Sequence, residues 1–328
     1  MAAVSPPPGP RPSRPETVTR AQVLGFSAIL VLLGAGWGIT QPLAKIAVST
    51  GYGHFGLIFW QMAITAAVLG LVTLLRGKGL PITRGTLRVY LMIALIGTII
   101  PNSASYQAVV HLPSGLMSVL LSLVPMLAFP VALLLGLERF QPVRLAGLSL
   151  GLVGVLLIVV PDASLPAPGL VGWVLFAIIA PLCYAWEGNL VARWGLAGLD
   201  AVQALFGASL LGVIIATPLA FFSGQFIDPF GPYTAADAAM LGSGLVHACV
   251  YATYVWLVGR AGPTFAVQVS YLVTGFGVFW ALLLLGESYS PYIWAALVLM
   301  LIGMALVQPR PRLAAPSPAD EELQSPAP

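Results

Sequence analysis

The stretch LLLGLERFQP at residues 133–142 recurs in altered form as LLLLGESYSP at residues 282–291. In both copies an apolar run ends at a glutamate that precedes a proline by four residues, Glu138 before Pro142 and Glu287 before Pro291. Each residue of the second pair lies 149 positions after its counterpart (138 to 287, and 142 to 291). A shared offset of this kind indicates an internal duplication, which sets the plan of the whole chain.

Two further pairs keep the same offset, Trp37 with Trp186 and Gly154 with Gly303. Four matches at one spacing are hard to reach by chance, so the sequence predicts two similar halves. Pro-rich ends flank them and are expected to be disordered cytoplasmic tails. The expected units are a tail at 1–21, a first repeat at 22–160, a second repeat at 169–308 and a tail at 309–328.

The composition places most of this chain in lipid. Hydrophobic residues make up 59% and charged residues 8%, whereas soluble domains carry about 25% charged residues. The net charge is +3, but the basic residues form no stripe with aromatic residues between them, so a nucleic-acid partner is not expected. The two cysteines, Cys183 and Cys249, lie in apolar runs and are interpreted as packing residues. The predicted class is an all-α polytopic membrane protein.

Ten apolar segments are long enough to cross a bilayer, for which a helix needs about 20 residues. The interval 89–137 contains no charged residue and exceeds one span, so residues 111–113 are expected to break it. Residues 259–263 make the corresponding break in the second half. The expected spans are 22–47, 55–75, 89–110, 113–136, 142–160, 169–191, 201–223, 237–258, 264–286 and 291–308.

The basic residues predict the orientation of these spans, because Lys and Arg remain preferentially on the cytoplasmic side. With both termini inside, every basic residue except Lys45 falls on that side. Asp228, Asp237 and Glu287 fall on the outer side. The chain is therefore predicted to be an N-in, C-in protein of the inner or plasma membrane.

Each repeat contains five expected spans, and five is an odd number. The second repeat must therefore enter the membrane in the opposite direction to the first. Inverted repeats of this kind are an architecture of secondary transporters, since two similar halves of opposite orientation can exchange inward-open and outward-open conformations. The sequence predicts alternating access.

No motif for metal-dependent or ATP-driven chemistry occurs in the sequence. It contains neither a His-Glu-x-x-His zinc motif nor a Gly-rich phosphate loop. Gly147 to Gly151 matches the Gly-x-Ser-x-Gly pattern of hydrolases, but it lies inside an expected span. These glycines, like Gly34 and Gly38, are interpreted as helix-packing faces. No enzymatic activity, cofactor or metal is expected.

Polar side chains at membrane depth are costly and usually face a cavity or another helix. Here they gather on expected spans 1, 3, 6, 8 and 9, with serines on span 4, whereas spans 5 and 10 are almost purely apolar. The pattern predicts a central, partly polar cavity for a small-molecule substrate, and a periphery facing lipid or a second copy in a homodimer. The candidate cavity residues are Trp37, Thr40, Gln41, Asn102, Tyr106, Ser122, Tyr184, Trp186, Glu187, His247, Tyr251, Tyr254, Gln268 and Tyr271.

Three ionisable residues each have two interpretations. Glu187 is either a site for a coupling proton or a substrate ammonium, or a partner of Arg193 near the inner end of its span. His247, with a reference pKa of about 6.5, suits proton exchange, or is a neutral packing residue. Lys45 either meets an anionic group of the substrate or extends to the outer surface.

The junction residues have a structural interpretation and a functional one. Pro142 and Pro291 suit the first turn of the helix that follows. Glu138 and Glu287 then face the positive end of that helix, so they are expected to cap the corner, with gating as the alternative. Prolines within or near the ends of spans are expected to kink them, either along the pathway or for packing: Pro42, Pro101, Pro125, Pro181 and Pro218.

These motifs resemble the EamA family of the drug/metabolite transporter superfamily. Trp37-Gly38 followed by Lys45 is similar to the opening pattern of that family, and Gly286-Glu287 followed by Pro291 is similar to its closing one. The resemblance covers residues 22–308. It implies a ten-helix exporter or exchanger of small metabolites, such as amino acids, with a central cavity and transport driven by ion or substrate gradients.

The chain departs from the family pattern at two places. One residue separates Gly136 from Glu138 in the first junction, and Gln61 stands where family members often carry arginine. The missing positive charge argues against an anion-binding role for the second span. A secondary transporter explains the inverted duplication best; the alternatives are a channel, sensor or structural membrane protein, and a lipid-modifying enzyme.

Overall fold

The computed structural model describes residues 20–161, 164–167, 169–261, 263–266 and 268–307. Within this part of the chain the secondary structure is helical and contains no strand, so the predicted all-α class is confirmed. The tails predicted at 1–21 and 309–328 lie outside the described residues, apart from residues 20 and 21.

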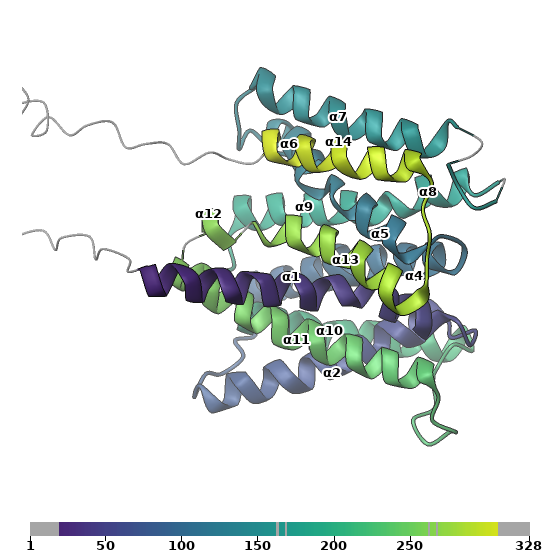
Figure 1. Ribbon diagram of the computed structural model, residues 1–328. Coiled ribbons are helices and arrows are strands. Elements are labelled where there is room, and N and C mark those ends of the chain that lie inside the picture. Colours follow the sequence, from purple (N-terminus) through teal and green to yellow (C-terminus); the bar gives the residue numbers. More distant parts are fainter. Residues whose placement is uncertain (1–19, 162–163, 168, 262, 267, 308–328) are drawn as a thin grey trace, which may run out of the picture.

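The helices follow one another along the chain in two successive sets (Figure 1). The first set is α1 (Arg20–Val48), α2 (His54–Leu75), α3 (Arg84–Met92), the π-helix η1 (Ile93–Ile99), α4 (Ile100–His111), α5 (Ser114–Leu121), α6 (Leu123–Leu134) and α7 (Pro142–Val159). The second set is α8 (Val171–Ala177), α9 (Ile179–Trp194), α10 (Ala201–Phe222), α11 (Ala235–Ala261), α12 (Pro263–Ala266), α13 (Val269–Leu285) and α14 (Pro291–Val307).

Eight helical segments of the described chain are long and apolar enough to cross a membrane, and α13 and α14 are shorter at 17 residues each. At about 1.5 Å per residue these two extend about 25 Å, close to the thickness of a hydrocarbon core. Three of the eight segments are composite, namely α3–η1–α4, α5–α6 and α8–α9. The ten predicted helical segments are thus present.

Prolines account for three interruptions inside these segments. A proline lacks the N–H that would bond to the carbonyl four residues earlier, so it weakens the helix at that point. Pro125 leaves the carbonyl of Leu121 without that donor, and α5 ends at Leu121. Pro181 likewise leaves the carbonyl of Ala177 without that donor, and α8 ends at Ala177. Pro101, in the first turn of α4, lies four residues after Gly97, which belongs to the π-helix η1. Breaks in the regular helix thus accompany these three prolines, whereas Pro42 lies inside α1 and Pro218 inside α10 without interrupting either helix.

The two halves run through the bundle in opposite senses. In Figure 1 the first helix of the chain, α1, and the first segment of the second half, α8–α9, run antiparallel, and the described chain begins and ends at the same end of the bundle. The break predicted at 111–113 is present, since Leu112 and Pro113 are extended between α4 and α5. These directions place corresponding corners of the two halves at opposite ends of the molecule.

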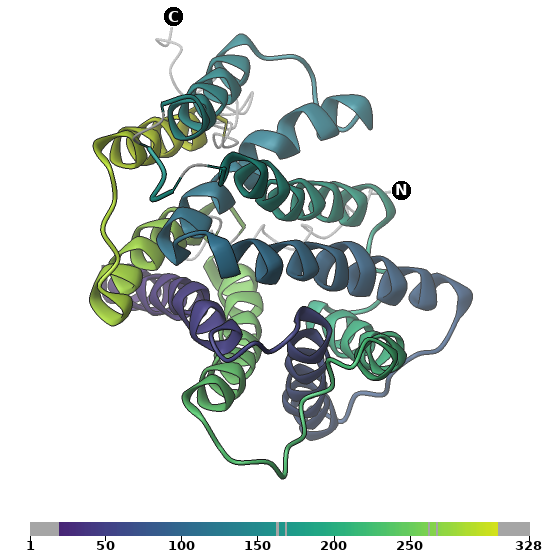
Figure 2. The same ribbon diagram turned by 90° about the vertical axis from the view of Figure 1, so that its right-hand side faces the viewer.

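Helices α7 and α14 pack against each other at the edge of the bundle, as Figures 1 and 2 both show. Small residues permit the close approach: a methyl group built at Gly147 would lie 2.6 Å from the backbone oxygen of Gly303. Gly154 similarly faces the side chain of Met300. The predicted peripheral position of spans 5 and 10 is confirmed, and so is the packing role of Gly147.

Gly147→Ala is expected to lower the thermal midpoint of the protein by several degrees, because the added methyl group collides with a backbone atom and such overpacking costs about 1–3 kcal/mol. The matched control is Gly188→Ala in α9, where the methyl group meets nothing within 4 Å. There the better helix propensity of alanine should leave stability unchanged or improved. Thermal unfolding of both purified variants in detergent measures the difference, and equal midpoints would contradict this account.

Helix α1 lies against α11 and α13 and forms one wall of the central site. A methyl group at Gly38 would lie 2.8 Å from the backbone nitrogen of Gly277, and one at Gly34 would overlap Leu272. The predicted small-residue face of α1 is confirmed. It brings the first half and the second half into direct backbone contact beside the cavity.

The two cysteines have different environments. Cys183 on α9 is partly buried, whereas Cys249 on α11 is exposed, and both are free. The packing role predicted for both is therefore wrong for Cys249, because its side chain has no complete shell of neighbours.

Candidate functional site

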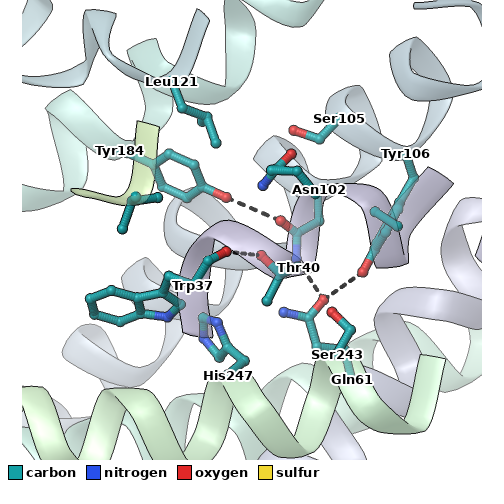
Figure 3. Close-up of a pocket in the computed structure, with 13 residues that line it drawn as sticks. Trp37, Thr40, Gln61, Asn102, Ser105, Tyr106, Leu121, Tyr184, Ser243 and His247 are labelled. Atoms are coloured by element: carbon teal, nitrogen blue, oxygen red, sulfur yellow. Dashed lines mark hydrogen bonds between the residues drawn. The ribbon is translucent and has the colours of Figure 1, made fainter. Parts of the chain in front are cut away.

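A cavity of about 170 Å³ lies at the centre of the bundle (Figure 3). Its walls come from α1, α2, α4, α5 and, in the second half, α9, α11 and α13. Both halves therefore build one site. The lining residues are Trp37, Thr40, Gln41, Ala44, Gln61, Asn102, Ser105, Tyr106, Leu121, Tyr184, Ser243, His247 and Val273.

A hydrogen-bonded network of amides and phenols forms one side of the cavity, as the dashed lines in Figure 3 show. The Gln61 Oε1 atom accepts from Asn102 Nδ2 at 3.0 Å and from the Tyr106 hydroxyl at 2.8 Å. The Tyr184 hydroxyl donates to Asn102 Oδ1 at 3.1 Å. Asn102 thus connects α2, α4 and α9, which fixes the orientation of the polar groups that a solute would meet.

An aromatic cluster forms the other side. The ring of Trp37 lies 6.4 Å from that of His247 and 5.3 Å from that of Tyr254. The Thr40 hydroxyl donates to the carbonyl of Trp37 at 2.6 Å, so it is held against its own helix. Figure 3 shows Trp37 and His247 side by side, across the cavity from Tyr106. The site therefore offers ring faces on one wall and amide and hydroxyl groups on the other.

None of the lining residues in the described chain is Asp, Glu, Lys or Arg. The lining combines hydroxyls, amides, one imidazole and apolar surface. A solute with a net charge would lose its hydration here without gaining an ionic partner, which costs several kcal/mol. A solute without net charge can instead exchange its water contacts for those of the amides and hydroxyls.

The structure brings seven of the predicted candidates to the cavity and places seven elsewhere. Those at the cavity are Trp37, Thr40, Gln41, Asn102, Tyr106, Tyr184 and His247. Tyr251 and Tyr254 stand behind this wall, with the Tyr251 ring 6.5 Å from that of His247. Trp186 packs in an apolar cluster with Leu190 and Leu205, and the buried Ser122 hydroxyl donates to the carbonyl of Val119.

The remaining three candidates lie farther from the network. Gln268 is exposed at the start of α13. Tyr271 lines a separate apolar hollow on the surface of α13, beside Phe276 and Phe279. Glu187 packs against η1, where a methyl group on Gly97 would overlap its carboxylate.

The predicted pairing of Glu187 with Arg193 is absent from the described chain. Arg193 instead donates to the backbone oxygen of Leu135, at the end of α6. The three ion pairs found among the described residues leave Glu187 out. The Glu187 carboxylate thus lies beside the π-helix with no basic partner among the described residues.

Lys45 has a structural role that neither of its two interpretations included. Its ammonium donates to three backbone oxygens at the end of α4, those of Val109 at 2.6 Å, Val110 at 3.1 Å and Leu112 at 3.0 Å. Helix ends leave such carbonyls without intrahelical donors. The lysine is therefore a C-terminal cap of α4, a role that sequence spacing gives no means of finding.

The two junction glutamates bind different partners, Glu138 beside its own corner and Glu287 across the two halves. Glu138 forms an ion pair with Arg144 of α7 at 2.8 Å. Glu287 was expected to cap the corner before α14. Instead it accepts hydrogen bonds from Ser114 and Gly115 at the start of α5 in the other half. The corner before α14 lies against α5, so the Glu287 carboxylate reaches the start of that helix.

Six lining residues are missing from the predicted candidates: Ala44, Gln61, Ser105, Leu121, Ser243 and Val273. Gln61 and Ser105 carry a usable signal, since each is a polar residue in an apolar span. Ser243 lies one helical turn before His247 and shares its face. Ala44, Leu121 and Val273 are apolar residues in apolar helices, and their sequence carries no signal.

Metal binding finds no support in the described part of the chain, where no group of three or more His, Cys, Asp or Glu side chains could hold an ion. The site consists of neutral side chains arranged around a solute-sized space. These observations define a class: a multi-pass integral membrane protein with two five-helix halves around a central polar cavity.

The EamA-like transporter family model matches residues 25–160 and 171–308. The chain belongs to this family, as its motifs predicted, and it is a secondary transporter and not an enzyme. The match consists of two EamA units, so the predicted internal duplication is confirmed.

One solved structure, described only as "Crystal structure of protein", is similar over 94% of this chain and 100% of its own, with a TM-score of 0.58 and 18% sequence identity. At this identity the likeness concerns the fold alone. A search of curated proteins finds no match.

Proposed function

We propose that this transporter exports or exchanges a small metabolite without net charge, such as an amphipathic compound or an amino acid whose ammonium and carboxylate groups offset each other. The observation that carries the proposal is the central cavity, whose lining is polar and aromatic but contains no Asp, Glu, Lys or Arg among the described residues. The amide network suits the polar groups of such a solute, and Trp37 suits an apolar part.

We propose an N-in, C-in orientation in the inner or plasma membrane. Arg76 and Lys78, at the end of the bundle where the described chain begins and ends, bind Asp200 at 2.9 and 2.6 Å. Burial raises the pKa of Asp200, but the hydrogen bonds that it accepts, including those from Lys78 and Arg76, outweigh burial and hold the pKa below its usual value. Lys45 and Glu287 belong to the opposite end. The concentration of basic residues at the first end supports a cytoplasmic location for it.

Alternating access is the proposed mechanism, carried out by the repeats at 22–160 and 169–308. The opposite directions of α1 and α8–α9 support it, because two similar antiparallel halves can exchange conformations. The proline-associated interruption at Leu121, a residue that lines the cavity, supplies a place where a segment can bend.

Counterflow in proteoliposomes tests this function. Vesicles that contain the protein are loaded with an unlabelled neutral amino acid or amphipathic metabolite, and uptake of the labelled compound is followed. A carrier is expected to show uptake accelerated by the internal compound. Flux that ignores the internal compound for every member of the panel would indicate a channel, and the absence of any flux would argue against transport of this class.

We also propose that Glu187 carries the coupling proton. The carboxylate packs against η1 and has no ion-pair partner in the described chain, so no basic side chain there stabilises its charged form. Its place on α9, one turn from the cavity residue Tyr184, supports a link between its proton and the solute.

Glu187→Gln is expected to abolish accumulation driven by a pH gradient, because glutamine cannot exchange a proton, while counterflow of the same compound continues. Uptake into proteoliposomes with and without an imposed pH gradient measures both quantities. Asp228→Asn, in a loop beyond α10, is the matched control and should retain gradient-driven accumulation. Accumulation by Glu187→Gln at the wild-type level would remove Glu187 from the coupling step.

A further inference from the structure

Two charged side chains hold the corner between α4 and α5, at the end of the bundle away from the described chain ends. Lys45 caps the last carbonyls of α4, and Glu287 binds the first residues of α5. Each charge has the sign that the helix end favours, positive at the C-terminus and negative at the N-terminus. The corner is therefore clamped from both sides.

The two contacts differ in the halves that they join. Lys45 belongs to α1, so its bonds to α4 lie within the first half. Glu287 belongs to the corner between α13 and α14, so its bonds cross from the second half to the first. Its Oε1 atom accepts from the backbone nitrogen of Ser114 at 2.7 Å and from the Ser114 hydroxyl at 2.9 Å, and its Oε2 atom accepts from the nitrogen of Gly115 at 3.0 Å.

Tyr289 completes this contact. Its hydroxyl donates to Glu287 Oε2 at 2.6 Å, and a methyl group on Gly115 would overlap the ring and its hydroxyl. Burial and the hydrogen bond to Glu287 raise the pKa of Tyr289, so the phenol remains a donor. Deeper along the same pair of helices, a methyl group on Gly277 would overlap Ser118. The start of α5 and the end of α13 thus pack tightly against each other, between the cavity and the end of the bundle away from the described chain ends.

At the counterpart of this corner, the ion pair that the glutamate makes in the described chain stays within one half. Glu138 corresponds to Glu287 at the offset of 149, yet its partner is Arg144 of α7, in its own half and at 2.8 Å. The two copies of one glutamate therefore show two arrangements, one engaged across the halves and one turned back to its own half. In a transporter whose halves exchange conformations, the two ends of the bundle are expected to differ in this way.

We propose that Glu287 is a gating residue, which closes the outer end of the cavity by binding Ser114 and Gly115 and releases them when that end opens. The proposal rests on the proposed alternating access and orientation. Lys45 holds α4 to α1 through three hydrogen bonds, so the α4–α5 corner keeps its shape when Glu287 releases it. Glu287 positions the halves and does not touch the solute.

Side-specific labelling of the cavity tests the gate. Ala44, a small lining residue on α1, is changed to cysteine in a background with Cys183→Ala and Cys249→Ala. A membrane-impermeant maleimide is then added to intact cells or to inside-out vesicles. Glu287→Gln is expected to accelerate labelling from the outside at least threefold, because the neutral amide binds the two N–H groups of α5 more weakly. The matched control, Glu138→Gln, should leave labelling from the outside unchanged.

The proposal would be overturned if Glu287→Gln left the rate of labelling from the outside unchanged. An equal rise in labelling from the outside and from the inside would also overturn it, because it would indicate general loosening of the bundle. If Glu287→Gln fails to fold, Glu287→Asp serves as the test. It keeps the charge on a shorter side chain, so its labelling rate from the outside should exceed that of the parent by a smaller factor. Equal rates for Glu287→Asp and the parent would also count against the gate. The sidedness of the parent tests the orientation, and counterflow tests the transport function, so the failures are distinguishable.

Discussion

Asn102→Leu is expected to reduce counterflow at least tenfold while the protein still inserts into the membrane. Asn102 supplies both a donor to Gln61 at 3.0 Å and an acceptor to Tyr184 at 3.1 Å. Leucine removes both bonds and leaves the Tyr184 hydroxyl without its acceptor. An unsatisfied polar group in a buried site costs about 1–3 kcal/mol, and about 1.4 kcal/mol corresponds to a tenfold change.

Gln107→Leu is the matched control for this change. Gln107 is another amide of α4, and in the described chain its side chain bonds to the carbonyl of Ser103 within the same helix. Its replacement should change counterflow less than twofold. Tyr106→Phe removes the other donor to Gln61 and leaves the Asn102 bonds in place, so an intermediate loss is expected. Wild-type counterflow by Asn102→Leu would separate the network from the solute pathway.

Lys45→Met is expected to destabilise the protein by about 3 kcal/mol or more, since each hydrogen bond to a charged donor contributes roughly 1.5–3 kcal/mol. The ammonium serves three carbonyl oxygens at distances of 2.6, 3.1 and 3.0 Å. Methionine fills similar space but donates nothing, so these oxygens lose their partner in a position that water reaches only in part. The thermal midpoint in detergent should fall by several degrees.

Lys78→Met provides the comparison for Lys45. Lys78 also loses a short bond, at 2.6 Å to Asp200, but Arg76 continues to bind that carboxylate at 2.9 Å. Both basic side chains are well exposed, and exposed pairs contribute little. The midpoint of Lys78→Met should therefore stay close to that of the parent. If the two lysine variants unfold at the same temperature, the capping role assigned to Lys45 is wrong.

The helices of this fold were predictable because lipid imposes a simple rule on sequence. Apolar runs of sufficient length and a repeated corner, marked by Glu138 and Glu287, were enough to define ten segments and two halves. Kinks were expected at five prolines, but the helices break only near Pro101, Pro125 and Pro181 and continue through Pro42 and Pro218. A proline weakens a helix at a position that the sequence shows, but packing determines whether the helix breaks there.

The candidate site was predictable in part. Asn102, Tyr184 and His247 are polar residues at membrane depth, so the cost of burying them pointed to a cavity. Partners were not predictable, since contacts such as Glu287 with Ser114 join residues 173 positions apart. Arg193 was assigned to a neighbour in sequence, whereas the fold gives it a carbonyl of α6. Sequence spacing shows which residues share one face of one helix. To predict a site between helices, one must also know how the helices pack against each other.

The uncharged lining of the cavity has an electrical consequence. A difference of 100 mV across a membrane is worth about 2.3 kcal/mol for each elementary charge that crosses. A solute without net charge, held by amides and rings, feels none of this force, so voltage alone would neither concentrate nor expel it. With the proposed coupling proton on Glu187, charge would cross with that proton, and the transport current recorded on a solid-supported membrane would then count protons and not solute molecules.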